Sequence, residues 1–112
     1  MGSLLSKQLT EEEMTQVQEL VEKIISENKV VVFSKSYCPY CKRAKDVLKK
    51  LNVDFFVIEL DNEANGAAIQ DYLQQKTGQR TVPNIFINQK HIGGCDDLLS
   101  AERSGSLQKA LA

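Results

Sequence analysis

Apolar residues recur at helical spacing near the start of the chain and then give way to short, continuous apolar runs. In residues 11–27 they fall three or four positions apart, and Thr10 and Glu13 stand in the relative positions of a capping box. We therefore expect a helix over residues 11–27. The next run, KVVVF at residues 29–33, is β-branched and does not alternate, a pattern typical of a strand buried on both faces of a sheet.

Helical and strand patterns continue to alternate after this first strand. Residues 39–51 place apolar side chains on one face and lysines on the other, which predicts a second helix, and DFFVIEL at residues 54–60 predicts a second strand. With a helix between them, the two strands form a βαβ unit and should be parallel. Residues 63–78 predict a third helix, weakened in its first turn by Gly66 and ended by Gly78.

The remainder of the chain predicts a hairpin followed by helical turns. NIFI and KHIG, at residues 84–93, are separated by Asn88 and Gln89, a weaker turn pair than Asn-Gly. Residues 96–112 predict helical turns interrupted near Gly105. The sum is an α/β fold of three layers, a four-stranded mixed sheet flanked by helices in a thioredoxin-like arrangement.

Length and composition predict one domain in a reducing compartment. The chain has 112 residues, three cysteines and no apolar run of the ~18–20 residues that a membrane span requires. An odd cysteine count and the lack of a secretory signal argue against a secreted disulfide framework. We expect a cytoplasmic monomer with a flexible leader over residues 1–9 and a single domain over residues 10–112.

The first seven residues, MGSLLSK, also fit the N-myristoylation pattern, with Gly2 and Ser6 in the required places. The alternative is a short disordered leader or a remnant of cloning, which we favour. A single myristoyl chain gives only marginal membrane binding, so we do not expect a membrane partner unless Gly2 is acylated.

Positive charge is concentrated around two of the cysteines. Residues 29–50 hold seven Lys/Arg and one acid, although the whole chain has a formal net charge of −1. One interpretation is a solvated helix face, and the other is a patch that attracts an anionic substrate. Nucleic-acid binding is not expected, because the pI is 5.8 and aromatic residues hardly interleave with the charges.

The pair Cys38 and Cys41 stands where a strand ends and a helix begins. Pro39 occupies the first helical position, where its missing N–H costs nothing, so Cys38 lies close to the N-cap. Unpaired backbone N–H groups and the positive end of the helix dipole favour a thiolate there. Only a thiolate attacks disulfides, so Cys38 is the expected nucleophile, and Cys41, which faces the protein, the resolving thiol.

A zinc site is the structural alternative for these cysteines. His91 and Cys95 could complete a Cys3His ligand set with Cys38 and Cys41. A C-x-x-C beside a βαβ pattern, with a proline that begins a regular helix, fits a redox motif better, so no metal is expected. Cys95 then remains a buried or peripheral thiol.

Two later segments suggest a binding role. In QRTVPN, Pro83 precedes a predicted strand, where an X-Pro bond can be cis at a cost of about 0.5–1 kcal/mol, although a plain strand-start proline is equally compatible. In HIGGCDDL, two glycines permit close backbone approach. Either Asp96 or Asp97 could cap the next helix, or their carboxylates could receive the charged end of a ligand.

Taken together, SKSYCPYCKRAK, TVPNIFI and HIGGCDDL closely resemble the dithiol glutaredoxins of the C-P-Y-C class over roughly residues 16–112. The resemblance implies a glutathione-dependent thiol–disulfide oxidoreductase, with glutathione as co-substrate and glutathionylated or disulfide-containing proteins as partners. It makes Cys38 the nucleophile and Cys41 the resolving thiol. The glutathione-binding residues that it implies are Lys35, Tyr40, Gln79, Thr81, Val82, Pro83, Gly94, Cys95 and Asp96.

The resemblance also implies what some of these residues contact. Val82 would pair its backbone with the cysteinyl part of glutathione, beside a cis Pro83, and Gln79 would contact the glycine carboxylate. The γ-glutamyl end would lie at residues 94–96.

Two other functions compete with this interpretation. Some glutaredoxins hold a [2Fe-2S] cluster between subunits through the first cysteine and glutathione, but they tend to have a small residue in place of Pro39. Thioredoxin is the nearest enzymatic alternative, and this chain has neither a tryptophan nor the thioredoxin motif. We therefore favour glutathione-dependent exchange.

Overall fold

A computed structural model describes residues 9–112. The predicted first helix is confirmed as α2, Glu11–Glu27. Its capping box forms as expected: the Thr10 hydroxyl accepts from the Glu13 backbone N–H at 3.0 Å, and the Glu13 carboxylate accepts from the Thr10 N–H at 2.9 Å. The myristoylation pattern and nearly all of the predicted leader lie outside the described residues.

Four strands form one mixed sheet in the order β2-β1-β3-β4. The pair β1 and β2 is parallel, as predicted for a βαβ unit, while β3 runs antiparallel to both β1 and β4. This arrangement confirms the predicted four-stranded mixed sheet. The strands are β1 Val30–Ser34, β2 Phe56–Glu59, β3 Asn84–Ile87 and β4 Lys90–Gly93.

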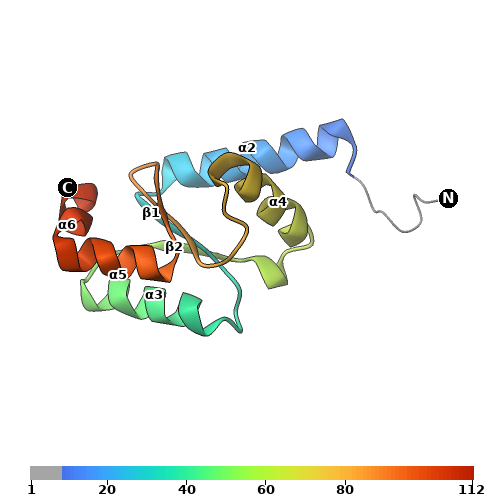
Figure 1. Cartoon of the computed structure of the whole chain (residues 1–112). Coiled ribbons are helices and arrows are strands. Elements are labelled where there is room, and N and C mark those ends of the chain that lie inside the picture. Colours follow the sequence, from blue (N-terminus) through green and yellow to red (C-terminus); the bar gives the residue numbers. More distant parts are fainter. Residues whose placement is uncertain (1–8) are drawn as a thin grey trace.

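Helices cover both faces of the sheet, which gives the three layers of a thioredoxin-like fold (Figure 1). The helices α2 and α4 pack on one face, and α3, α5 and α6 pack on the other. The remaining helical elements are α3 Pro39–Lys50, the 3-10 turn η1 Leu60–Asn62, α4 Gly66–Thr77, α5 Cys95–Ser104 and α6 Ser106–Leu111.

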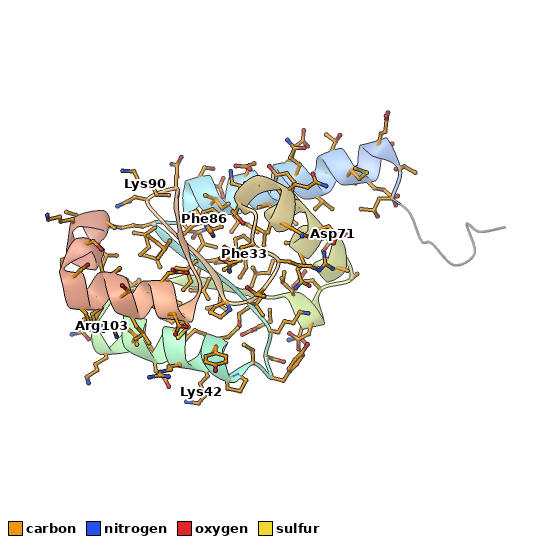
Figure 2. All side chains as sticks on the ribbon, viewed as in Figure 1. Phe33, Lys42, Asp71, Phe86, Lys90 and Arg103 are labelled. Carbon is orange, nitrogen blue, oxygen red and sulfur yellow. The ribbon has the colours of Figure 1, made fainter. Side chains whose placement is uncertain are left out.

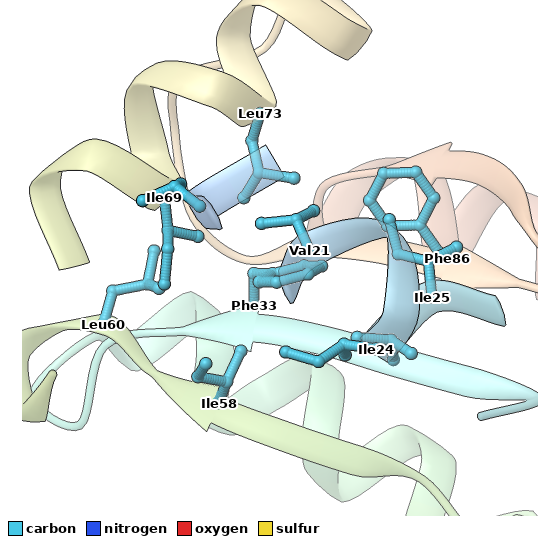
Figure 3. Close-up of a cluster of buried hydrophobic side chains, with 11 residues drawn as sticks. Val21, Ile24, Ile25, Phe33, Ile58, Leu60, Ile69, Leu73 and Phe86 are labelled. Atoms are coloured by element: carbon cyan, nitrogen blue, oxygen red, sulfur yellow. The ribbon is translucent and has the colours of Figure 1, made fainter. Parts of the chain in front are cut away.

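Strand β1 contributes to the core on both faces. Val31 and Phe33 join the cluster under α2 and α4, where the Phe33 and Phe86 rings meet edge to face with centroids 5.9 Å apart (Figure 3). Val30 and Val32 join the opposite cluster, under α3, α5 and α6. Because successive side chains of a strand alternate between faces, this placement confirms the expected doubly buried strand.

Two details differ from the expectations. The second strand is shorter than predicted, because pairing with β1 spans only Phe56–Glu59 and the chain then turns into η1. Gly66 is more than a weak helical residue: a Cβ built on it would lie 1.9 Å from the carbonyl oxygen of Leu60. The close approach of η1 and α4 therefore depends on the absence of a side chain at this position.

Predicted turns and interruptions occur where the sequence placed them. Asn88 and Gln89 adopt positive φ values of 49° and 69°, as a tight hairpin turn with the strand twist requires. Gly78 and Gly105 lie in the left-handed region at the ends of α4 and α5. In the part of the chain that the structure describes, no helix is long and apolar enough to cross a membrane.

Candidate active site

Cys38 is the N-cap residue of α3, immediately after the loop that follows β1. Pro39 occupies the first turn as expected, and the Cys38 sulfur accepts a hydrogen bond from the Cys41 backbone N–H at 3.2 Å. This contact satisfies one of the backbone donors that a helix start leaves unpaired. Because Cys38 is only partly buried, a substrate can reach it.

Cys41 lies one turn into α3, and its side chain is fully buried. Burial raises the pKa of its thiol to about 11, and a hydrogen bond with Cys38 adds to the rise. The backbone N–H of Lys35 and the hydroxyl of Ser34 act in the opposite direction. At neutral pH Cys41 is therefore a thiol. Both cysteines, and Cys95, are free in this structure.

A segment more than forty residues away along the chain lies beside the Cys38 sulfur. The Cys38 thiol is 3.8 Å from the carbonyl oxygen of Val82, within the range of a weak S–H···O contact. The Val82–Pro83 peptide bond is cis, as the resemblance implied. Pro83 is buried, whereas Thr81 is exposed and Val82 is partly exposed. The structure therefore brings the predicted TVP segment to the predicted nucleophile.

Gln79 supports this segment from within the chain. Its side-chain amide donates to the carbonyl oxygens of Thr81, at 3.0 Å, and Pro83, at 2.9 Å. With both amide N–H groups bound to backbone, Gln79 fixes the conformation of residues 81–83. A contact between Gln79 and a carboxylate stays a prediction of the resemblance.

The start of α5 joins the same region through Gly94. A Cβ built on Gly94 would lie 3.6 Å from the Pro83 carbonyl oxygen and 3.9 Å from the Gln79 amide nitrogen. The backbone N–H of Gly94 donates to the carboxylate of Asp97 at 2.9 Å. The N-cap residue of α5 is thus Gly94, and Asp97 makes the capping contact from inside the helix, which leaves the exposed Asp96 carboxylate available for other contacts.

Cys95 is buried as well, with 4% of its surface exposed. It is the first residue of α5 and belongs to the core cluster on the α3 side of the sheet, and burial raises the pKa of its thiol. The side chains of Arg43 and Cys38 are close enough for their charges to act on it. At the predicted site Cys95 can therefore offer its backbone more readily than its sulfur.

Lys35 and Tyr40 flank Cys38 on either side. The Lys35 carbonyl accepts the Cys38 backbone N–H at 3.0 Å, so the two residues share one tight turn. Tyr40 stands in the first turn of α3 and is 60% exposed. The exposed Tyr40 side chain can therefore reach a ligand placed against Cys38, and a contact from the Lys35 side chain stays a prediction of the resemblance.

Two residues that sequence analysis did not single out hold the loop before Cys38. The carboxylate of Asp61 accepts from the Ser36 backbone N–H at 2.8 Å and from the Ser36 hydroxyl. These hydrogen bonds, together with the nearby charge of Lys35, lower the pKa of Asp61. Asp61 lies 25 positions along the chain from Ser36, and an acid directly after a strand was the only signal in the sequence.

The basic patch, residues 29–50, is partly neutralised within the protein. Lys42 pairs with Asp46 at 2.9 Å across one helical turn, and Lys45 pairs with Glu59 at 2.9 Å. Lys42 lies on the outer side of α3, away from the sheet (Figure 2), with 78% of its side chain exposed. An exposed pair of this kind is worth little energetically, so the charge remains open to an anionic partner.

The zinc alternative requires a cluster of ligands, which the described residues do not form. Within residues 9–112 no three His, Cys, Asp or Glu side chains gather in a way that could hold a metal ion. The His91 Nε2 atom instead lies 2.8 Å from the Asn84 side-chain oxygen. Burial lowers the pKa of His91.

Comparisons with known proteins agree on one family. The family model described as Glutaredoxin matches residues 30–92. Glutaredoxin-1 of Rhizophagus irregularis is 59% identical over 99 residues, which cover 88% of this chain and 98% of that protein. Glutaredoxin-C4 of Arabidopsis thaliana is 52% identical over 93 residues, covering 83% and 69%. The crystal structure of a buckwheat glutaredoxin–glutathione complex superimposes with a TM-score of 0.89 at 47% identity, covering 92% and 94%.

Proposed function

This chain belongs to the glutaredoxin family, and from that premise we propose that it is a dithiol glutathione-dependent oxidoreductase. The proposed substrates are protein–glutathione mixed disulfides and protein disulfides. One observation carries the proposal: Cys38 is partly exposed at a helix start, and its sulfur lies between the Cys41 backbone N–H and the Val82 carbonyl. Glutaredoxins that bind a [2Fe-2S] cluster tend to have a small residue at the position of Pro39, so we favour thiol–disulfide exchange over cluster binding.

In the proposed first step, Cys38 attacks the glutathione sulfur of a mixed disulfide. A bond forms between Cys38 and glutathione, and the protein thiolate leaves. The Cys41 N–H and the start of α3 stabilise negative charge on Cys38 before the attack. A second glutathione thiolate then attacks the glutathione sulfur on Cys38, which releases glutathione disulfide and returns the Cys38 thiolate.

The placement of the predicted binding residues supports a tripeptide lying across Cys38. If the cysteinyl sulfur of glutathione lay in line with Cys38, the backbone of that cysteinyl residue would lie beside Val82, because the Val82 carbonyl is 3.8 Å from the Cys38 sulfur. The exposed carboxylate of Asp96, at the start of α5, suits the ammonium of the γ-glutamyl end. The positive charges of Lys35 and of the rest of the basic patch suit the carboxylates of glutathione.

Cys41 has a narrower role in this scheme. Since it is fully buried and its pKa is about 11, it does not compete with Cys38 for an incoming substrate. Reduction of a protein disulfide leaves Cys38 bonded to the protein, and Cys41 then displaces that protein to form a Cys38–Cys41 disulfide. Removal of glutathione from a mixed disulfide requires Cys38 alone.

A matched pair of cysteine variants tests the proposal. With glutathione and a glutathionylated protein as substrates, we expect Cys41→Ser to keep most of the rate and Cys38→Ser to lose it. With a protein disulfide as substrate, both variants should lose most of the rate. The released protein thiol or glutathione disulfide is measured in each case.

Comparable loss of deglutathionylation in both variants would contradict the proposal, because it would make Cys41 essential to a step assigned to Cys38 alone. A folded control comes from Cys95→Ser, in which the third thiol is removed and both cysteines of the motif are kept.

A further inference from the structure

The turn that carries Cys38 lies between β1 and α3 and is not held by burial. The backbone N–H of Cys38 donates to the Lys35 carbonyl at 3.0 Å, which closes a tight turn with Ser36 and Tyr37 at its centre. Both central residues are exposed, Tyr37 with 71% of its surface. Because packing does not fix these two residues, the position of Cys38 depends on the hydrogen bonds of the turn.

Asp61 binds the centre of this turn from a different element, η1. One oxygen of its carboxylate accepts from the Ser36 backbone N–H at 2.8 Å, and the other accepts from the Ser36 hydroxyl. In the part of the chain that the structure describes, these are the hydrogen bonds that join Ser36 and Tyr37 to another element. Two bonds to one residue restrict its orientation as well as its position.

The backbone around Asp61 is fixed by packing on both sides. The preceding residue, Leu60, is 2% exposed and belongs to the core under α2 and α4. Its carbonyl accepts from the Glu63 backbone N–H at 3.3 Å and lies against Gly66 of α4. On the other side, Glu59 pairs in register with Ser34, the last residue of β1. Asp61 therefore presents an exposed carboxylate from a rigid base.

We propose that Asp61 is a positioning residue for the reaction of Cys38: through Ser36 it holds the turn so that the Cys38 sulfur keeps the direction required for attack on a disulfide. The inference rests on the proposed function, in which Cys38 attacks the glutathione sulfur of a mixed disulfide. As the bond between Cys38 and glutathione forms, the bond between glutathione and the substrate protein breaks, and the electron pair leaves on the protein sulfur. Such a step is fast only when the reacting atoms are aligned.

The charge of Asp61 offers a second way to act on the turn. The hydrogen bonds from Ser36 and, to a smaller extent, the charge of Lys35 lower the pKa of Asp61. Asparagine separates the two effects, because it has no charge but keeps a carbonyl oxygen that can accept from the Ser36 N–H. Its amide can also donate to the Ser36 hydroxyl oxygen. Alanine removes the charge and the hydrogen bonds together.

The test is the transfer of glutathione from a glutathionylated protein to Cys38, measured in single turnovers with Cys41→Ser as the parent. Rapid mixing and acid quenching give the rate at a series of substrate concentrations. We expect Asp61→Ala to lower the maximal rate about tenfold. The half-saturating concentration should change by less than about twofold, because the binding segments at residues 79–83 and 94–96 are not altered. Asp61→Asn should recover the maximal rate to within about twofold of the parent.

Glu63→Ala is the matched control, because it removes an exposed acid two residues farther along the same segment. Its maximal rate should stay within about twofold of the parent. Thermal unfolding of each variant identifies a temperature at which all of them are folded, and the rates are compared at that temperature.

Three results would overturn the inference and leave the proposed function intact. They are an unchanged maximal rate in Asp61→Ala, an equal loss in Asp61→Asn or Glu63→Ala, and a loss that consists only of a raised half-saturating concentration. Failure of the Cys41→Ser parent to take glutathione onto Cys38 would overturn the proposed function and the inference together.

Discussion

Cys38 and Cys41 lie within one turn of α3 but in different surroundings. Cys38 ends the β1–α3 loop and is partly exposed, and its sulfur accepts the Cys41 N–H at 3.2 Å. Cys41 points into the core, where burial raises its pKa to about 11. The two thiols are chemically identical, and only their surroundings make their reactivity differ, because reactivity depends on the fraction of thiolate and on access to the sulfur.

Selective alkylation should show this separation. At about pH 7 we expect iodoacetamide to modify one cysteine, Cys38, because Cys41 and Cys95 are buried and their pKa values are raised. Peptide mapping by mass spectrometry identifies the modified residue. In a denaturant all three cysteines should react. Labelling of Cys41 ahead of Cys38 in the folded protein would contradict the assignment of roles.

At the scale of elements, most of the fold was predictable because its patterns are local. Apolar periodicity located the helices and strands, Thr10 and Glu13 marked the start of α2, and Pro39 marked the start of α3. Contacts between distant segments were not predictable. The bonds from Asp61 to Ser36 and from Gln79 to the backbone of residues 81–83 depend on how the elements pack.

Gly66 shows how packing can reverse a local expectation. By helix propensity alone, Gly66→Ala should stabilise α4 by about 0.8–1.0 kcal/mol. In the structure the new Cβ would lie 1.9 Å from the Leu60 carbonyl oxygen. We therefore expect the substitution to destabilise the protein by about 1–3 kcal/mol, the usual cost of overpacking, in urea unfolding monitored by circular dichroism.

The matched control is Gly78→Ala at the other end of α4. No heavy atom lies within 4 Å of the added Cβ, but φ is 81°, so the cost should be only about 1–2 kcal/mol. A Gly66→Ala protein as stable as the unmodified one, or more stable, would show that η1 and α4 are not in close contact.

At the scale of the whole molecule, stability should depend on pH in the alkaline range. The pKa of Cys41 is raised from 9.0 to about 11, so the folded protein holds this proton more tightly than the unfolded chain. The contribution to stability is complete below about pH 9 and is lost as pH rises through about 11. Tyr72, whose hydroxyl donates to Glu22 and whose pKa is raised to about 12, acts in the same direction.

Comparison of the unmodified protein with Cys41→Ser isolates the contribution of the Cys41 thiol to stability, because the tyrosine and the lysines titrate in both proteins. Between about pH 8 and pH 10.5 the free energy of unfolding should fall further in the unmodified protein, by on the order of 1–2 kcal/mol. Urea midpoints at the two pH values give the difference. An equal decrease in the free energy of unfolding of both proteins would mean that Cys41 is not held as a buried thiol.

The most direct measurement identifies the residue to which glutathione is bonded after the first step. Cys41→Ser is mixed with a glutathionylated protein in the absence of free glutathione, quenched with acid, and mapped by mass spectrometry. Because Cys38 attacks the glutathione sulfur in the proposed cycle, we predict glutathione bonded to Cys38 and a released, reduced protein substrate. A mixed disulfide between Cys38 and the substrate protein, or glutathione on Cys95 with Cys38 unmodified, would contradict that assignment.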